Sequence, residues 1–198
     1  MLLRQAGIEP ELQPTDVDED ALIERALAEQ GSLTPQSYVL LLARAKAEAF
    51  IGTDAALGFT GLVLGGDSSL ELDGEMLGKP HAPERARERW LLQRGRTAIL
   101  HSGHCLIRME DGRAIASAAV ATATALTFSA DITEDEIDAY VATGEPLQVA
   151  GAFTIDGRGA AFIDTIAGDP STVIGMSIPA VRRLARDLGV TWHDLWNL

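Results

Sequence analysis

The sequence is poor in cysteine, and this scarcity limits the chemistry available to it. Cys105 is the only cysteine among 198 residues. Neither an intramolecular disulfide nor a zinc site built from several thiolates can therefore form. A chain without disulfides suits a reducing compartment, and we expect a cytoplasmic protein.

Basic residues are scarce relative to acidic ones. The 16 lysines and arginines stand against 29 aspartates and glutamates, which gives a formal net charge of −13. Nucleic-acid polymers and anionic membranes are themselves negative, so this balance argues against both as partners. A small anionic ligand can still bind where a local basic cluster or a metal ion overrides the overall field.

Long apolar runs are missing as well. No uncharged apolar stretch approaches the roughly 20 residues that a membrane-spanning helix requires. Hydrophobic residues nevertheless make up 46% of the chain and charged residues 23%, which is enough for a packed core. The length fits one domain, and we expect a single soluble domain over residues 1–198.

Helix-like and strand-like segments alternate along the chain, which predicts an α/β fold. Thr34 is a plausible N-cap and Pro35 a first helical residue. Two hairpin turns and a capping box are also recognisable: Asp73-Gly74, Asp111-Gly112 and residues 133–136. The patterns predict helices over residues 18–30, 35–52, 83–93 and 178–188, and strands over residues 61–66, 98–109, 114–128 and 160–166.

Asp67 directly follows the expected strand over residues 61–66. A carboxylate at a strand end lies where α/β sheets usually hold ligands, and Gly65 and Gly66 would let a ligand approach the backbone. Such a carboxylate could hold a divalent metal or take a proton from an attacking water. Alternatively, Asp67 belongs to a turn and hydrogen-bonds its own backbone. Spacing alone leaves both interpretations open.

Two lysines are candidates for binding a phosphate. Lys79 lies between Gly78 and Pro80, where a rigid backbone could present a fixed charge, although most loop lysines are merely solvated. No Ser or Thr follows Lys79, so this segment is not a P-loop. Lys46 lies beside the apolar stripe of the helix expected over residues 35–52, and it either covers that stripe with its stem or projects into a cleft.

The acidic run over residues 16–20 could supply a metal ligand or cap the helix that follows it. His101 and His104 are three positions apart in an expected strand, so their side chains should leave opposite faces and are interpreted as structural. The tryptophans are expected to pack rather than to stack on bases: Trp90, Trp192 and Trp196.

Taken together, these segments resemble the Maf family of nucleotide pyrophosphatases. The matching segments run in family order: residues 2–8, 16–19, 45–47, 65–68, 72–80, 95–97, 136–140, 143–146, 150–153, 155–159 and 168–175. The most specific are the segment around Gly78-Lys79-Pro80 and the block over residues 143–159, and the resemblance covers nearly the whole chain.

The resemblance implies a fold, an enzymatic activity and, as an alternative to that activity, a regulatory function. The fold would be that shared with inosine triphosphatases: an elongated, curved mixed β-sheet flanked by helices, with two lobes and a central cleft. The activity would be hydrolysis of (deoxy)nucleoside triphosphates to monophosphate and pyrophosphate, which removes non-standard nucleotides. The family is also linked to cell division and septum formation, so a nucleotide-binding regulator with little catalysis is the alternative. Dimers are common in the family, so a homodimer is one assembly that the resemblance allows.

The resemblance also implies residue roles. Asp67 would be the catalytic carboxylate, acting as proton acceptor or metal ligand, and Lys46 and Lys79 would face the triphosphate. Asp18 would lie close to a divalent metal, Mg²⁺ or Mn²⁺. Attack on the α-phosphorus needs an activated water and charge neutralisation on the leaving pyrophosphate, which such a set provides.

The chain departs from the family pattern at several positions. Members usually open with a strand and a Ser-x-Ser-Pro-Arg loop, whereas this sequence starts inside the expected first helix, for which a misassigned start or a truncation is the simplest hypothesis. Ser68 and Asp156 occupy substrate-binding positions that hold Thr and Gln in members preferring thymidine or uridine nucleotides, and Val149 replaces a common lysine. Ionised Asp156 only accepts hydrogen bonds, which would favour a base that offers donors.

Overall fold

The computed structural model describes residues 2–197, and their backbone groups into two compact units. Within the described chain, unit 1 comprises residues 2–67, 102–122 and 175–197. Unit 2 comprises residues 68–101 and 123–174.

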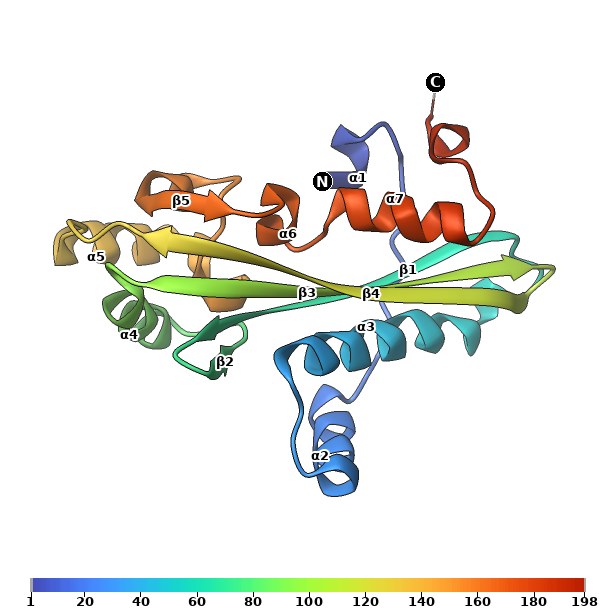
Figure 1. Ribbon diagram of the computed structural model, residues 1–198, viewed down its shortest axis with the longest axis horizontal. Coiled ribbons are helices and arrows are strands. Elements are labelled where there is room, and N and C mark those ends of the chain that lie inside the picture. The colour runs from blue at the N-terminus through green and yellow to red at the C-terminus, as the bar shows by residue number, and fades with distance from the viewer. Residues whose placement is uncertain (1, 198) are drawn as a thin grey trace. The chain divides into compact units, whose positions relative to one another are not determined.

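Helices and strands alternate as the sequence predicts (Figure 1). The α-helices are α1 (Leu2–Gln5), α2 (Glu19–Gln30), α3 (Pro35–Ile51), α4 (Pro83–Gln93), α5 (Glu134–Ala142), α6 (Pro170–Ile174) and α7 (Ile178–Asp187). The strands are β1 (Gly61–Leu72), β2 (Glu75–Leu77), β3 (Thr97–Glu110), β4 (Arg113–Phe128) and β5 (Ile163–Ala167). Short 3₁₀ turns are η1 (Asp54–Ala56), η2 (Glu145–Gln148), η3 (Ala150–Ala152), η4 (Arg158–Phe162) and η5 (Trp192–Leu195). Among residues 2–197, no helix combines the length and apolarity needed to cross a bilayer.

The strands form one sheet in the order β2-β1-β3-β4-β5. Its outer pairs are antiparallel: Leu70 of β1 lies opposite Leu77 of β2, and Leu126 of β4 lies opposite Ile166 of β5. A single five-stranded sheet flanked by helices confirms the predicted α/β class.

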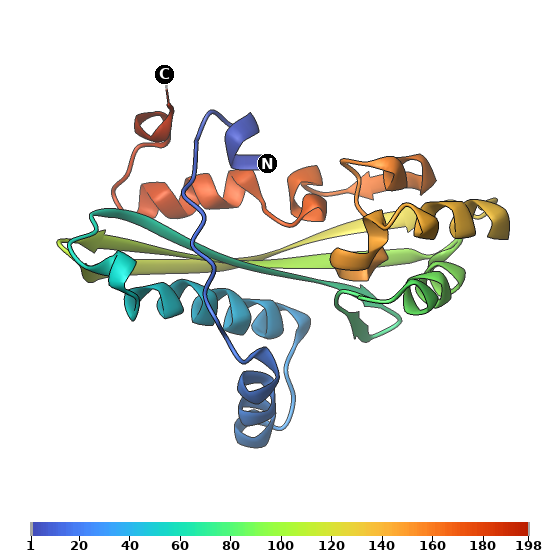
Figure 2. The ribbon, with the colours of Figure 1, turned by 180° about the vertical axis from the view of Figure 1, so that it is seen from behind.

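Unit 1 packs helices on both faces of its strand segments. Both views place α3 on one face and α7 on the other (Figures 1 and 2). The α3 residues Ala43 and Ala47 share a core cluster with Ile107 of β3, whereas Leu184 of α7 packs in another cluster with Leu106. Because neighbouring strand residues point to opposite faces, β3 serves both clusters at once.

Two glycines bring α3 into direct backbone contact with its strands. A methyl group built at Gly65 would lie 2.3 Å from the Ala43 carbonyl oxygen and 2.6 Å from the Ala47 nitrogen. One built at Gly103 would lie 2.2 Å from the Val39 carbonyl oxygen. The space over Gly65 is therefore filled by α3, and the prediction that this glycine admits a ligand is wrong.

Unit 2 is organised around Trp90 of α4, whose side chain is fully buried. Its ring meets those of Phe128, Tyr140 and Phe162 edge-on at centroid distances of 5.4, 5.2 and 5.5 Å. The indole N–H donates to the Ala152 carbonyl oxygen at 2.8 Å, so the polar atom of this large side chain is satisfied. The expectation that Trp90 packs is confirmed.

Two strand boundaries differ from the sequence-based expectation. The strand expected over residues 61–66 continues to Leu72, so Asp67 lies inside β1 rather than at its end. The extension is stabilised by pairing with β2 and by burial of Leu70 and Leu72. The strand expected from residue 160 begins only at Ile163, because residues 158–162 form the turn η4.

Replacing Gly65 by alanine is expected to lower the free energy of unfolding by about 1–3 kcal/mol, because the new methyl group would collide with the backbone of α3. Chemical denaturation measures this loss. Gly66→Ala is the matched control, since its methyl group would meet the Gly103 carbonyl oxygen at an ordinary 3.7 Å. An equal loss of stability in both variants would contradict the role assigned to Gly65.

Candidate active site

Lys46 and Asp67 meet in unit 1. The Lys46 ammonium donates a hydrogen bond to the Asp67 carboxylate, with Nζ 2.6 Å from Oδ1. The same nitrogen lies 2.9 Å from Oε1 of Glu19. The side chains of Lys46 and Asp67 are 27% and 12% exposed, so the pair is largely shielded from bulk water. The result is one ammonium held between two carboxylates.

Each member of this cluster comes from a different element. Asp67 lies in β1, Lys46 in the middle of α3, and Glu19 is the first residue of α2. The contact of α3 with Gly65 occurs two residues before Asp67 and brings the turn that carries Lys46 onto this strand. The helix itself begins at the predicted N-cap, where the Thr34 hydroxyl accepts the Ser37 N–H at 3.1 Å.

The cluster is electrostatically balanced toward a charged lysine. Burial lowers the pKa of Lys46, but the hydrogen bonds that its ammonium donates to Asp67 and Glu19 outweigh this and leave the pKa above its usual value. Lys46 is therefore a permanent cation at physiological pH. Tyr38, also on α3, has its pKa raised by burial and then by the nearby Asp67 and Glu19 carboxylates, so it remains a neutral phenol.

The acidic run over residues 16–20 caps the helix that follows it, which is one of the two roles expected for it. Asp18, predicted near a metal, is the N-cap of α2, and its carboxylate accepts the Ala21 N–H at 3.0 Å. Its neighbour Glu19 is the residue that contacts Lys46. Sequence reasoning missed Glu19 and Tyr38. The available signals were the acidic run and the eight-residue spacing from Tyr38 to Lys46, which places both on one side of a helix.

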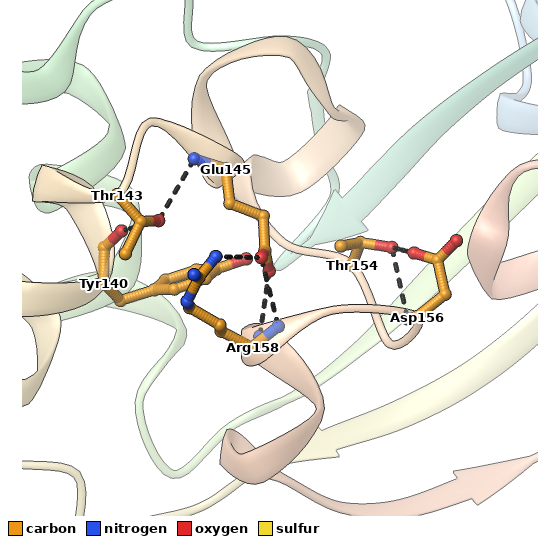
Figure 3. Close-up of polar contacts among 7 residues, drawn as sticks. Tyr140, Thr143, Glu145, Thr154, Asp156 and Arg158 are labelled. Carbon is orange, nitrogen blue, oxygen red and sulfur yellow. Dashed lines mark hydrogen bonds and ion pairs between the residues drawn. The ribbon is translucent and has the colours of Figure 1, made fainter.

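The other predicted site residues belong to unit 2. Ser68 is half-buried in β1, and Lys79 is exposed between β2 and α4. Asp156 is exposed in the loop before η4, where the Thr154 hydroxyl donates to its carboxylate (Figure 3). Among the residues described in unit 2, Lys79 and Asp156 form no ion pair with each other.

The two buried histidines have separate partners. His101 Nε2 lies 2.7 Å from Oε2 of Glu71 in unit 2, whereas His104 Nε2 accepts the Ser177 N–H at 2.9 Å in unit 1. Across residues 2–197, no group of three or more His, Cys, Asp or Glu side chains is arranged to hold a metal ion. Each histidine thus has a polar partner within its own unit, and the structural interpretation of the pair stays a prediction.

The cluster makes a direct prediction about titration. Lys46 and Lys79 are the only lysines in the sequence, so their side-chain carbons give two resolvable NMR signals, and Lys79→Arg identifies the one from Lys46. Asp67→Asn is expected to lower the pKa of Lys46, because it removes the shorter of two carboxylate contacts while burial remains. An unchanged or higher midpoint in Asp67→Asn would show that the ion pair does not control this lysine.

Comparisons with known proteins place this chain in a family. The sequence profile described as Maf-like protein matches residues 1–188. The chain is 55% identical over 197 residues to a protein of Leifsonia xyli, covering 99% of this chain and 91% of that protein. It is 49% identical over 196 residues to a protein of Nocardia farcinica, covering 99% and 91%. Both relatives are named nucleoside triphosphate pyrophosphatase. The chain belongs to the Maf-like protein family.

Proposed function

We propose that this chain hydrolyses nucleoside triphosphates to monophosphate and pyrophosphate, as the names of its relatives indicate for them. The observation that carries the proposal is the half-buried contact of 2.6 Å between the Lys46 ammonium and the Asp67 carboxylate. It supplies a proton acceptor and a phosphate-binding charge in one place, on a molecule whose overall charge of −13 would otherwise repel a triphosphate.

In the proposed reaction Asp67 accepts a proton from a water molecule. The water oxygen bonds to the α-phosphorus, and the bond from that phosphorus to the oxygen bridging to the β-phosphate breaks. Pyrophosphate leaves with the electron pair of that bond, so one water is consumed for each triphosphate. Asp67 must be ionised to act as a base, and the adjacent Lys46 ammonium favours that form.

The Lys46 ammonium can bind a substrate phosphate while it keeps its contact with Asp67. An ammonium carries three N–H donors. Within the described residues, its partners are Asp67 and Glu19, which leaves one donor for a phosphate oxygen. Lys79, in the Gly78-Lys79-Pro80 segment, would supply the second cation for the triphosphate.

A divalent metal, Mg²⁺ or Mn²⁺, is part of the proposal. Asp67 and Glu19 both direct carboxylate oxygens at the Lys46 ammonium. Carboxylate oxygens are also the donors that Mg²⁺ and Mn²⁺ prefer. Magnesium commonly uses one or two protein carboxylates together with substrate phosphates, so this small donor set fits. Asp67 would hold the ion, with Asp18 close to it, and the ion would neutralise charge that develops on the phosphates.

Asp156 and Ser68 are proposed to contact the nucleotide. Asp156 is exposed and, when ionised, offers only acceptors, so it is suited to a base edge that carries N–H donors. Removal of non-standard nucleotides is the physiological role that this activity would serve. A homodimer and a cytoplasmic location stay predictions.

Asp67→Asn is expected to lower kcat for pyrophosphate release by about 10²–10⁴-fold, since an amide cannot take the proton from water. Chelation of divalent metal should abolish the wild-type activity, and Mg²⁺ or Mn²⁺ should restore it. Asp187→Asn, an exposed carboxylate of unit 1 paired with Arg186, is the matched control and should keep full activity. Wild-type turnover by Asp67→Asn would overturn the assignment. Nucleotide-dependent thermal stabilisation of the wild type without turnover would instead favour a regulator.

Asp156→Asn is expected to change the ratio of kcat/KM between bases by about tenfold or more, because asparagine offers donors where aspartate only accepts. A pyrophosphate-release screen over standard and modified triphosphates measures the ratio. Asp131→Asn, an exposed position of the same unit, is the control. An identical base preference in wild type and Asp156→Asn would remove Asp156 from the recognition site.

A further inference from the structure

The carboxylate of Glu145 is bound by the backbone of a loop in unit 2. Its Oε1 accepts the Gly159 N–H at 3.0 Å, and its Oε2 accepts the Arg158 N–H at 3.1 Å (Figure 3). The side chain is 18% exposed. Because two consecutive amides donate to the two oxygens of one carboxylate, the contact fixes the orientation of the loop as well as its distance, as a bidentate pair does.

The loop is shaped to admit this carboxylate. A methyl group built at Gly157 would lie 2.6 Å from Oε1 of Glu145. One built at Gly159 would lie 2.6 Å from the Thr154 carbonyl oxygen and 2.7 Å from the Tyr140 hydroxyl. The residues on either side of Arg158 are therefore in contact with Glu145, Thr154 or Tyr140, and the loop has little room to move.

The negative charge of Glu145 strengthens its hydrogen bonds to the loop amides. Burial raises the pKa of Glu145, but the amide hydrogen bonds from Arg158 and Gly159, together with the Tyr140 hydroxyl and the Arg158 charge, outweigh it and leave the pKa below its usual value. The pKa of Tyr140 is raised by burial and then by the adjacent Glu145 carboxylate. At physiological pH an anionic acceptor therefore meets neutral donors, which strengthens each bond relative to a neutral pair.

Asp156 lies at the tip of this loop, one residue before Gly157. On its N-terminal side the Thr154 hydroxyl donates to the Asp156 carboxylate. On its C-terminal side the backbone is held by Glu145 two and three residues later. The exposed carboxylate is thus supported from both directions, although Glu145 does not itself contact it.

We propose that Glu145 is a positioning residue for nucleotide selection: by binding the Arg158 and Gly159 amides, it holds the Asp156 carboxylate in the orientation that reads the base. This inference rests on the proposed function and on the role proposed there for Asp156. Both oxygens of Glu145 are engaged by the loop, so its action on a nucleotide is indirect. The Arg158 guanidinium lies 3.5 Å from Glu145 and is 72% exposed, so the backbone amides dominate the contact.

The test is Glu145→Gln, which keeps one acceptor oxygen and turns an N–H donor toward a loop amide. Hydrogen exchange at the Arg158 and Gly159 amides should accelerate by about tenfold or more. The ratio of kcat/KM between preferred and non-preferred bases should fall by about tenfold, since small misplacement of a recognition group is costly. The Kd ratio for non-hydrolysable triphosphate analogues should fall in parallel.

Two controls isolate the amide contacts. Glu136→Gln removes another carboxylate that accepts a backbone N–H, that of Thr133 at 2.8 Å, on α5 of the same unit. Arg158→Ala removes the guanidinium and keeps the backbone amide. Neither control should alter base selectivity.

The outcomes separate this inference from the proposed function. Unchanged amide exchange in Glu145→Gln overturns it, and so does faster exchange with unchanged base selectivity. A selectivity change of equal size in Arg158→Ala would assign the effect to the guanidinium and also overturn it. A wild type without turnover would refute the proposed function alone, because exchange and the Kd ratio still decide the role of Glu145.

Discussion

Unit 1 depends on the close packing of α3 against the backbone of β1 and β3, with no side chains between them at Gly65 and Gly103. Gly65 and Gly103 both face the backbone of this helix at distances that exclude even a methyl group. A helix that packs directly on strand backbone, without flexible side chains between them, has a well-defined distance from the strands and a well-defined rotation about its axis. This packing brings Lys46 within reach of Asp67, and Glu19 of α2 contacts the same ammonium.

Local signals in the sequence predicted much of the fold. Pro35 after Thr34 marked the start of α3, and residues 133–136 form the predicted capping box, because both depend on chemistry within a few residues. The end of β1 could not be predicted in the same way. A Gly-Gly-Asp segment resembles a turn, and only pairing with β2 and burial of Leu70 reveal that the strand continues.

The candidate site was predictable only in part, for a related reason. Lys46 and Asp67 were identified through resemblance to a family and not through spacing. Glu19 was missed because the choice between neighbouring acidic residues depends on how α2 begins: Asp18 caps the helix, and the next side chain is then the one directed at Lys46. Such a choice is a property of tertiary placement that no local pattern records.

The glycines on either side of Arg158 have a consequence for which positions of this loop can be substituted. Gly157 and Gly159 have no room for a side chain, and the carboxylate beneath them is committed to backbone atoms, which every amino acid possesses. The position just before them, Asp156, is exposed and free of those demands. Under the proposed function, a substitution at Asp156 alone would change the preferred nucleotide, while the hydrogen bonds of Glu145 to the loop amides would stay as they are.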